Sequence, residues 1–318
     1  MDELASHPTG GLARASQNSR FGKQIANSAW LYLFLLPAIA YIFIFRYIPI
    51  YGAQIAFRDY FPGRSIVDSP WVGWKHFSAF ITSFQFPRVM RNTILLSLGD
   101  VIFTFPLPII FAIGLHYQRS RAVKRSVQMI AYAPYFISTI VLAGILLVFL
   151  SPRTGPVNIV LRSLGHRPIF FFGDPIYFRP IYIASSVWQF TGYNAIIYLA
   201  VLAGVSPELH ESAMIDGATK LKRILHVDIP HLAPTMAVLL ILRLGRTLQL
   251  GFEKAYALQT PLNLAASEII ETYVYKLGLE QAQFSYAAAI GLFLNAVNLV
   301  ILLAANSVTK RLTSYGLF

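Results

Sequence analysis

Six long apolar stretches, separated by polar segments, dominate the pattern of the chain. They cover residues of about 29–49, 92–115, 127–150, 178–204, 231–252 and 285–308. A helix of about 20 apolar residues crosses the hydrocarbon core of a bilayer. We therefore predict an all-α, polytopic integral membrane protein with six transmembrane helices. Pro106, Pro108 and Pro134 interrupt the second and third stretches, which membrane helices tolerate where neighbouring groups satisfy the freed backbone.

The composition supports a membrane protein rather than a soluble one. Of 318 residues, 56% are hydrophobic and 13% charged, and the mean hydropathy is +0.56. Residues 1–28 are polar and are predicted to form a cytoplasmic N-terminal tail, followed by one transmembrane domain over 29–318. A cleavable signal peptide is the alternative, but the apolar run from Trp30 to Ile48 is too long for one. The chain has no cysteine, which excludes disulfide and thiolate chemistry.

Charge is distributed over both sides of the predicted membrane domain, with a formal net charge of +12. Lysines and arginines are nearly as numerous in the predicted outer loops as in the inner ones. The densest group lies between the second and third apolar stretches: Arg119, Arg121, Lys124 and Arg125. Because short cytoplasmic loops collect Lys and Arg, this density favours a cytoplasmic N-terminus.

Three cations fall inside predicted spans. Arg46 lies near the end of the first span, where a long side chain reaches the headgroups. Arg243 and Arg246 lie near the bilayer centre, where a lone cation is costly and faces a partner or an aqueous path. With Gln249 and Glu253 they are predicted to form a polar stripe along one helix. An ion pair with a carboxylate on a partner subunit is one explanation; we favour a path for an anionic solute.

The polar segment of about 206–230, between the fourth and fifth spans, predicts a short helix. Ser206 suits the cap, Pro207 the first helical position, and Glu208 the positive end of the helix dipole. Leu209, Ala213 and Met214 would give this helix a small apolar patch. Gly217 would end it in a left-handed turn.

The same segment carries a motif. Glu211, Ser212 and Ala213 are followed by Asp216-Gly217-Ala218, and Pro230-x-Leu232-x-Pro234 closes the pattern. It resembles the EAA loop of ABC importer permeases, with Ser212 and Ile224 as departures of similar residue class. Further stretches resemble permeases of the carbohydrate-uptake class and are similar to the first permease subunit of bacterial alginate importers; these stretches are Ser69–Phe77, Arg91–Thr93, Tyr132–Tyr135, Trp188–Asn194 and Gly251–Leu258.

This resemblance implies a type I ABC importer permease fold in the bacterial inner membrane, with a cytoplasmic EAA coupling helix. The implied partners are a second homologous permease, two ATPase subunits, a periplasmic solute-binding protein, membrane lipid and an oligosaccharide. ATP and Mg²⁺ would bind to the ATPase, so the chain itself would be non-catalytic. The residues implied to couple it to the ATPase are Glu208, Glu211, Ser212, Ala213, Asp216, Gly217 and Ala218.

No enzyme motif is present in the sequence. It has no G-x-x-x-x-G-K-[ST] loop, no H-E-x-x-H and no G-x-S-x-G. His226 and His231 flank the Pro230 turn, but a metal site needs further ligands, so we predict neither a metal nor a bound cofactor. Nothing in the sequence indicates a nucleic-acid partner.

Sugar contacts are harder to assign. Trp188, Tyr193 and Asn194, expected at the outer end of the fourth span, are candidates for stacking and amide hydrogen bonds, with ordinary helix packing as the alternative. A neutral sugar or another solute stays open as the substrate. A secondary carrier is a further alternative, although such carriers usually contain internal repeats and none is evident.

Overall fold

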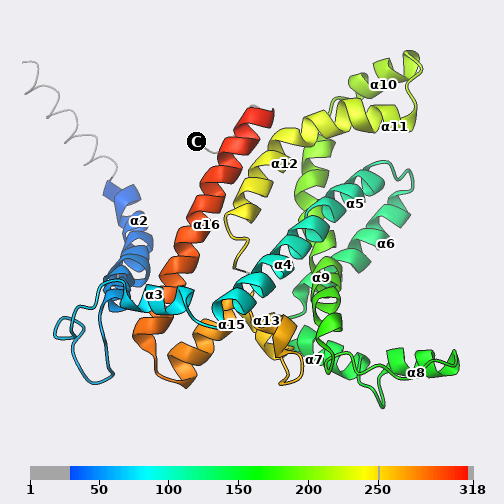
Figure 1. Ribbon diagram of the computed structural model, residues 1–318. Helices are drawn as coiled ribbons and strands as arrows, with labels where there is room; N and C mark the ends of the chain where they lie inside the picture. Colours follow the sequence, from blue (N-terminus) through cyan, green and yellow to red (C-terminus); the bar gives the residue numbers. More distant parts are fainter. Residues whose placement is uncertain (1–28, 250, 314–318) are drawn as a thin grey trace, which may run out of the picture. The chain divides into compact units, whose positions relative to one another are not determined.

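The computed structural model describes residues 29–249 and 251–313 (Figure 1). The predicted cytoplasmic tail, residues 1–28, lies outside the described residues. The chain divides into two units, residues 1–55 and 56–318, which are described separately below.

The first unit is a single helical run. It contains α2 (Ala29–Ile42), the π-helix η1 (Phe43–Tyr47) and most of the 3₁₀-helix η2 (Ile48–Phe57). Residues Trp30–Phe57 are long and apolar enough to cross a membrane, and none of their most hydrophobic window is buried. Apolar side chains on all faces suit a helix that contacts lipid. Arg46 lies in η1 with an exposed side chain.

The second unit is also helical, and the only strand-like feature among its described residues is an isolated bridge between Arg58 and Trp71. Its helices, in chain order, are α3 (Lys75–Ile81), α4 (Phe86–Thr104), α5 (Pro106–His116), α6 (Arg121–Tyr132), η3 (Ala133–Phe136), α7 (Thr139–Phe149), α8 (Pro156–Ser163), α9 (Pro175–Ala203), α10 (Pro207–Ile215), α11 (Lys220–Arg223), η4 (Ile224–Asp228), α12 (Ile229–Leu244), α13 (Phe252–Ala257), α14 (Leu264–Ser267), α15 (Ile270–Tyr275), η5 (Lys276–Glu280) and α16 (Phe284–Thr313).

The predicted spans are confirmed in number if each bent helix pair is counted as one crossing. Four described helical runs pass as spans, and two bent pairs bring the total to six. Within the second unit the straight ones are Phe86–His116, Lys220–Leu244 and Phe284–Arg311. The fifth span begins and ends earlier than the predicted 231–252. It ends because Gly245, a poor helix former, caps α12, and the next residues form tight turns, with the Arg246 N–H donating to the Arg243 carbonyl at 3.1 Å.

The third predicted span is bent rather than straight. The helical stretch Arg121–Phe136 and helix α7 meet at 99°. Pro134 lacks an amide donor, and at this point the α-helix changes to the short 3₁₀ turn η3. Ser138 then has extended backbone and caps α7, with its hydroxyl accepting from the Val141 N–H at 3.3 Å. The fourth span is α9, which turns by 71° into α10.

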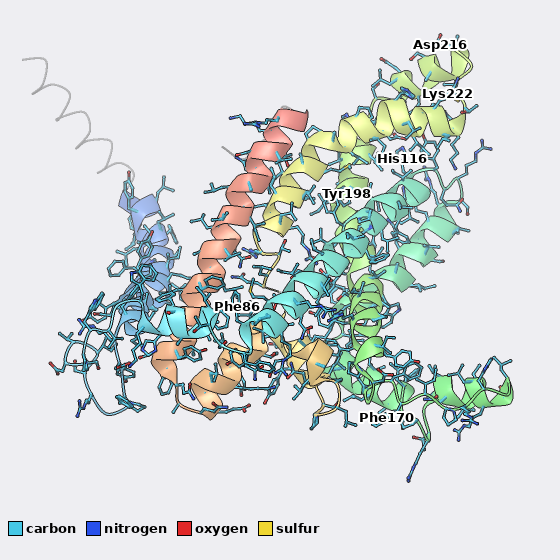
Figure 2. All side chains as sticks on the ribbon, in the orientation of Figure 1. Phe86, His116, Phe170, Tyr198, Asp216 and Lys222 are labelled. Atoms are coloured by element: carbon cyan, nitrogen blue, oxygen red, sulfur yellow. The ribbon has the colours of Figure 1, made fainter. Side chains whose placement is uncertain are left out.

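Helix α9 is central to the second unit, where it packs against α4, α5, α6 and α12. A Cβ on Gly192 would lie 2.1 Å from the Ala131 carbonyl oxygen, so only glycine permits this approach of α9 to α6. One end of the second unit carries α10 and α11, marked by Asp216 and Lys222 in Figure 2. Phe86, where α4 begins, and Phe170 lie toward the other end.

Candidate functional site

A cavity of about 570 Å³ lies among helices α4, α9, α12 and α13. A volume of this size is typical of ligand sites, which range from about 300 to 1,000 Å³. Its charged lining residues are Asp100, Arg243, Arg246 and Lys254, and its main uncharged polar ones are Ser97, Thr104, Ser186, Gln189, Asn194 and Gln249. Cations therefore outnumber carboxylates in its wall.

Arg243 pairs with a carboxylate of its own chain. Its Nη2 donates to Asp100 Oδ2 in α4 and to the Thr104 hydroxyl at 3.1 Å. The alternative explanation in the sequence analysis placed the ion-pair partner of the two arginines on another subunit, and for Arg243 that partner is instead Asp100 of the same chain. The Thr104 hydroxyl, which accepts from Arg243, also donates to the backbone carbonyl of Asp100 at 2.7 Å. Thr104 therefore contacts both residues of the ion pair.

Arg246 differs from Arg243. Its side chain is exposed to the cavity, and no carboxylate pairs with it in the part of the chain that the structure describes. Gln249 also lines the cavity, and its amide donates to Asn295 at 3.4 Å. Glu253 lies on α13, outside the cavity lining. The predicted stripe along one helix is therefore wrong, because α12 ends at Leu244, but three of its four residues still meet at the cavity.

The three sugar-contact candidates lie in the middle of α9, not at its outer end, because that helix begins at Pro175. Asn194 lines the cavity. Trp188 and Tyr193 do not; Tyr193 instead stacks on Tyr135, with ring centroids 3.6 Å apart. Only Asn194 of the three is therefore positioned to contact a solute in this cavity.

Lys254 is a cavity residue that the sequence analysis missed. Its side chain is buried, its Nζ donates to the Ser186 hydroxyl at 2.6 Å, and Nζ lies 4.3 Å from the centroid of the Tyr182 ring. Helix α13 lies outside the candidate spans. Burial lowers the pKa of Lys254 to about 8, and the negative charge of Asp100 opposes part of this decrease. The residue stands outside every apolar stretch, so hydropathy gave no signal for it.

A second cavity, of about 480 Å³, lies where α4 and α9 begin. Its lining includes three arginines. Arg88 pairs with Glu268, whereas Arg179 donates to the amide oxygen of Asn92 at 2.8 Å. No described carboxylate pairs with Arg91 or Arg179. This second cavity is also cationic.

Helix α10 confirms the predicted local structure of the motif segment. The Ser206 hydroxyl accepts from the Glu208 N–H at 3.3 Å, and Pro207 occupies the first turn. Gly217 has a φ of +75°, and the following Ala218 N–H donates to the Ala213 carbonyl at 2.8 Å.

Most residues of α10 are exposed. Its exposed apolar side chains are Leu209, Met214 and Ile215, and Ala213 is half-buried. The acidic residues Glu208, Glu211 and Asp216 are exposed as well, as are Ser212 and Gly217, while Ala218 is half-buried. The helix thus presents apolar and acidic groups together at one end of the second unit.

Residues 104–314 match the model of the family described as "Binding-protein-dependent transport system inner membrane component". The chain belongs to this family. It is the non-catalytic permease subunit of an ABC transporter, an integral membrane protein with the fold that the sequence predicted.

Similar curated proteins cover nearly the whole permease. "Protein LplB" of Bacillus subtilis (strain 168) is 40% identical over 289 residues, 91% of each chain. The "Polygalacturonan/rhamnogalacturonan transport system permease protein YteP" of the same organism is 38% identical over 307 residues, 96% of each chain.

The permease also resembles solved structures. A bacterial ABC transporter "involved in the import of the acidic polysaccharide alginate" contains a chain that is 40% identical, with a TM-score of 0.86, covering 92% of this permease and 99% of that chain. A chain of the bacterial alginate transporter in complex with an alginate pentasaccharide-bound periplasmic protein gives a TM-score of 0.87 at 40% identity, covering 94% and 100%.

Proposed function

We propose that the permease forms half of the translocation path of an ABC importer for an acidic oligo- or polysaccharide, such as a uronate polymer. It would lie in a bacterial inner membrane with its N-terminus in the cytoplasm. Its partners in this proposal are a second homologous permease, two ATPase subunits that bind ATP and Mg²⁺, and a periplasmic solute-binding protein.

The observation that carries the proposal is the charge of the large cavity. Three cations line it against one carboxylate, and Asp100 is already engaged by Arg243. Arg246 is therefore available to an anionic solute, and the buried Lys254, held by Ser186 and Tyr182, adds its positive charge to the wall of the cavity. A uronate residue brings a carboxylate that must be compensated when it leaves water, and an arginine supplies paired, charge-assisted hydrogen bonds to it. A neutral sugar gains less from these groups.

Two further observations support an acidic solute. The second cavity adds Arg91 and Arg179 without described carboxylate partners, at the ends of α4 and α9 opposite to α10. In the proposed orientation this is the outer face. Similar proteins are also named for the transport of polygalacturonan or rhamnogalacturonan and for the import of alginate, which are acidic polymers.

Coupling to the ATPase is assigned to α10. Its exposed apolar side chains Leu209, Met214 and Ile215 project from different sides of the helix, and Glu211 adds an exposed charge. A short, capped helix with exposed apolar and acidic side chains can dock into a groove of another protein. Rigid-body motion of docked helices would then change the access of the cavity.

The decisive substitution is Arg246→Ala in the complete transporter. We expect uptake of an acidic oligosaccharide to fall by about tenfold or more, because a hydrogen bond to a charged group contributes about 1.5–3 kcal/mol. Uptake is measured in proteoliposomes with acidic and neutral oligosaccharides of equal length. Arg246→Lys retains the charge and should retain part of the activity.

Arg64→Ala is the matched control, since Arg64 is an exposed loop residue that lines neither cavity. It removes one charge from the permease and should leave uptake unchanged. A wild-type preference for the neutral sugar, or full acidic uptake by Arg246→Ala, would overturn the acidic assignment while leaving the family unaffected.

A further inference from the structure

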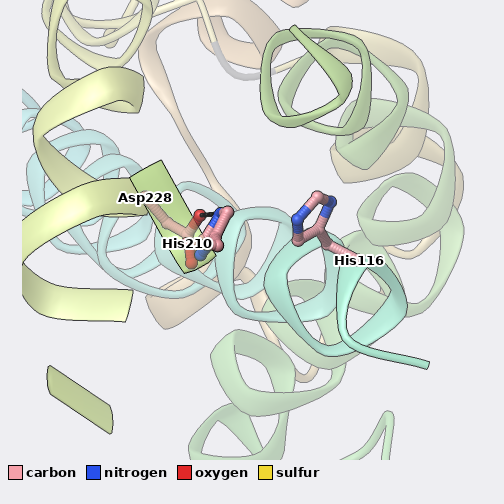
Figure 3. Close-up of side chains that lie close together, drawn as sticks. All are labelled: His116, His210 and Asp228. Carbon is pink, nitrogen blue, oxygen red and sulfur yellow. Dashed lines mark ion pairs between the residues drawn. The ribbon is translucent and has the colours of Figure 1, made fainter. Parts of the chain in front are cut away.

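Three potential metal ligands meet where α10 approaches the end of α5 and η4, and none of them lines the proposed solute path. His116 is the last residue of α5, His210 lies in α10, and Asp228 is the last residue of η4 (Figure 3). One ligand atom from each lies within 4.8 Å of the others. The cluster differs from the histidines singled out in the sequence, since neither His226 nor His231 belongs to it.

The buried polar atoms of this cluster lack adequate partners. Asp228 is completely buried; its Oδ2 accepts from the Tyr117 hydroxyl at 2.7 Å, but its Oδ1 accepts no hydrogen bond from any described residue. Both ring nitrogens of His210 are buried and likewise make no hydrogen bond. His210 Nε2 lies 3.3 Å from Asp228 Oδ1, which is within ion-pair distance. Buried polar atoms left in this way are costly and require an explanation.

A metal ion would satisfy these atoms together. We propose that His116, His210 and Asp228 form a binding site for a transition-metal dication such as Zn²⁺. Two imidazoles and one carboxylate suit the borderline-soft ions of this class. Tyr117 completes the arrangement, because its hydrogen bond to Oδ2 orients the carboxylate and directs Oδ1 to the ion.

The spacing requires little rearrangement. Ligand atoms at about 2.1 Å from a tetrahedral Zn²⁺ lie about 3.4 Å apart. His210 and Asp228 already meet this value at 3.3 Å. His116 is half-buried at the end of its helix, and a shift of at most about 1.4 Å brings its ring nitrogen into range. Its partial exposure also provides an entry route for the ion.

Nearby cations set the strength of the site. Lys220 Nζ and the Arg223 guanidinium lie 4.7 and 5.8 Å from the centroid of the Tyr117 ring. Their positive charge opposes a dication, so binding is weaker than at a structural zinc site. A reversible site of this kind suits regulation better than folding.

The three ligands come from three separate segments, so a bound ion ties α10 to α5 and to the start of α12. This consequence rests on the proposed coupling role of α10, whereas ion binding itself does not. An ion that holds α10 in one position slows ATP hydrolysis by the complete transporter.

Binding is tested on the complete transporter, purified without a polyhistidine tag and freed of metal by a chelator. Titration calorimetry with Zn²⁺ should show one site per chain, and Co²⁺ should give the visible absorption of a four-coordinate site. His116→Ala and His210→Ala should lose the site. Tyr117→Phe should weaken it by about 10–100-fold. His226→Ala is the matched control, because His226 lies on η4 outside the cluster, and it should bind as the wild type does.

Absence of a stoichiometric site, or equal binding by the wild type and His116→Ala, would overturn the proposal and leave a His210–Asp228 ion pair. ATP hydrolysis is then measured with and without Zn²⁺ in the wild type and in His116→Ala. Inhibition of the wild type alone supports the regulatory role. Binding without inhibition overturns that role only, and neither result bears on whether the substrate is acidic.

Discussion

Single charged residues in the large cavity have different roles, set by their partners. Arg243 and Asp100 neutralise each other, although the Arg243 side chain is 44% exposed and only the Asp100 side chain is largely buried. Substitution of Arg243 would leave the Asp100 carboxylate without its cationic partner, so it would affect the local structure as well as any contact with a solute. Arg246 has no described carboxylate partner, so its charge is directed to the cavity contents.

Lys254 gives the cavity a charge that changes near neutral pH. Burial lowers its pKa to about 8, so the ammonium is present below that pH and is lost above it. We expect the KM for an acidic oligosaccharide to rise as the pH increases through about 8, because the ammonium that attracts the solute is lost there. The measurement is uptake by proteoliposomes with the same pH on both sides.

The variant Lys254→Met tests the source of this pH dependence. It removes the titrating charge, so acidic uptake should be low at every pH, without a midpoint near 8. Basal ATP hydrolysis, measured at each pH, serves as the control for the ATPase. An unchanged midpoint in Lys254→Met would assign the titration to another group.

The residues of the cavity were only partly predictable. Arg243 and Arg246 stand out because cations are rare at membrane depth. Asp100 is an equally visible carboxylate in the second apolar stretch, but it is 143 residues from Arg243, and only the three-dimensional structure shows that the two side chains meet. The difference between the paired Arg243 and the unpaired Arg246 also depends on where α12 ends.

Among the helices, the contact between α9 and α6 depends on Gly192. A Cβ at this position would lie 2.1 Å from the Ala131 carbonyl oxygen, closer than atoms approach without a backbone shift. We expect Gly192→Ala to lower the melting temperature of the purified transporter, because close-packed interiors tolerate added volume poorly and overpacking costs about 1–3 kcal/mol.

Gly114→Ala is the control for this substitution. Gly114 lies in α5, and a Cβ there would meet nothing within 4 Å. Alanine is the better helix former by about 1 kcal/mol, so this variant should be as stable as the wild type or more stable. Equal melting temperatures for Gly192→Ala and the wild type would show that α9 and α6 do not approach as closely in the membrane.

Helix α10 provides the corresponding prediction for coupling. Gly217, with a φ of +75°, ends the helix in a conformation that a β-branched residue cannot adopt without strain. We expect Gly217→Val, and also Glu211→Ala, to reduce transport and substrate-stimulated ATP hydrolysis together, while the amount of permease in the membrane stays normal. Gly165→Val is the control, because its φ of +81° imposes similar strain in a loop far from the motif. Wild-type transport by both α10 variants would contradict the coupling assignment.

Local sequence predicted some features of the helices and missed others. The cap at Ser206, the proline at the start of α10 and the left-handed Gly217 follow from short-range preferences and are confirmed. The bend of 99° before α7 was not predicted. A straight helix and a bent one can have the same apolar sequence, so hydropathy alone does not distinguish a straight span from a bent one.

For the whole molecule, the decisive feature is that the permease has a cavity but no nucleotide motif. Its large cavity is lined mainly by cations among its charged groups, and its sequence contains no phosphate-binding loop. In the proposed transporter, conformational changes of the ATPase must therefore be transmitted to the permease through a contact surface such as α10. In the proposed importer a second permease completes the path, so this chain needs to supply only half of it.

We therefore expect the chain alone to give no ATP-dependent uptake. The purified permease is placed in liposomes with ATP on the side of α10 and with an acidic oligosaccharide, bound to its solute-binding protein, on the other side. Because the chain has no phosphate-binding loop, nothing in it converts ATP into movement. The same liposomes with the second permease and the ATPase added should accumulate the sugar. Uptake by the single chain that depends on an ion gradient rather than on ATP would instead indicate an autonomous carrier. That result would also contradict the proposed coupling role of α10.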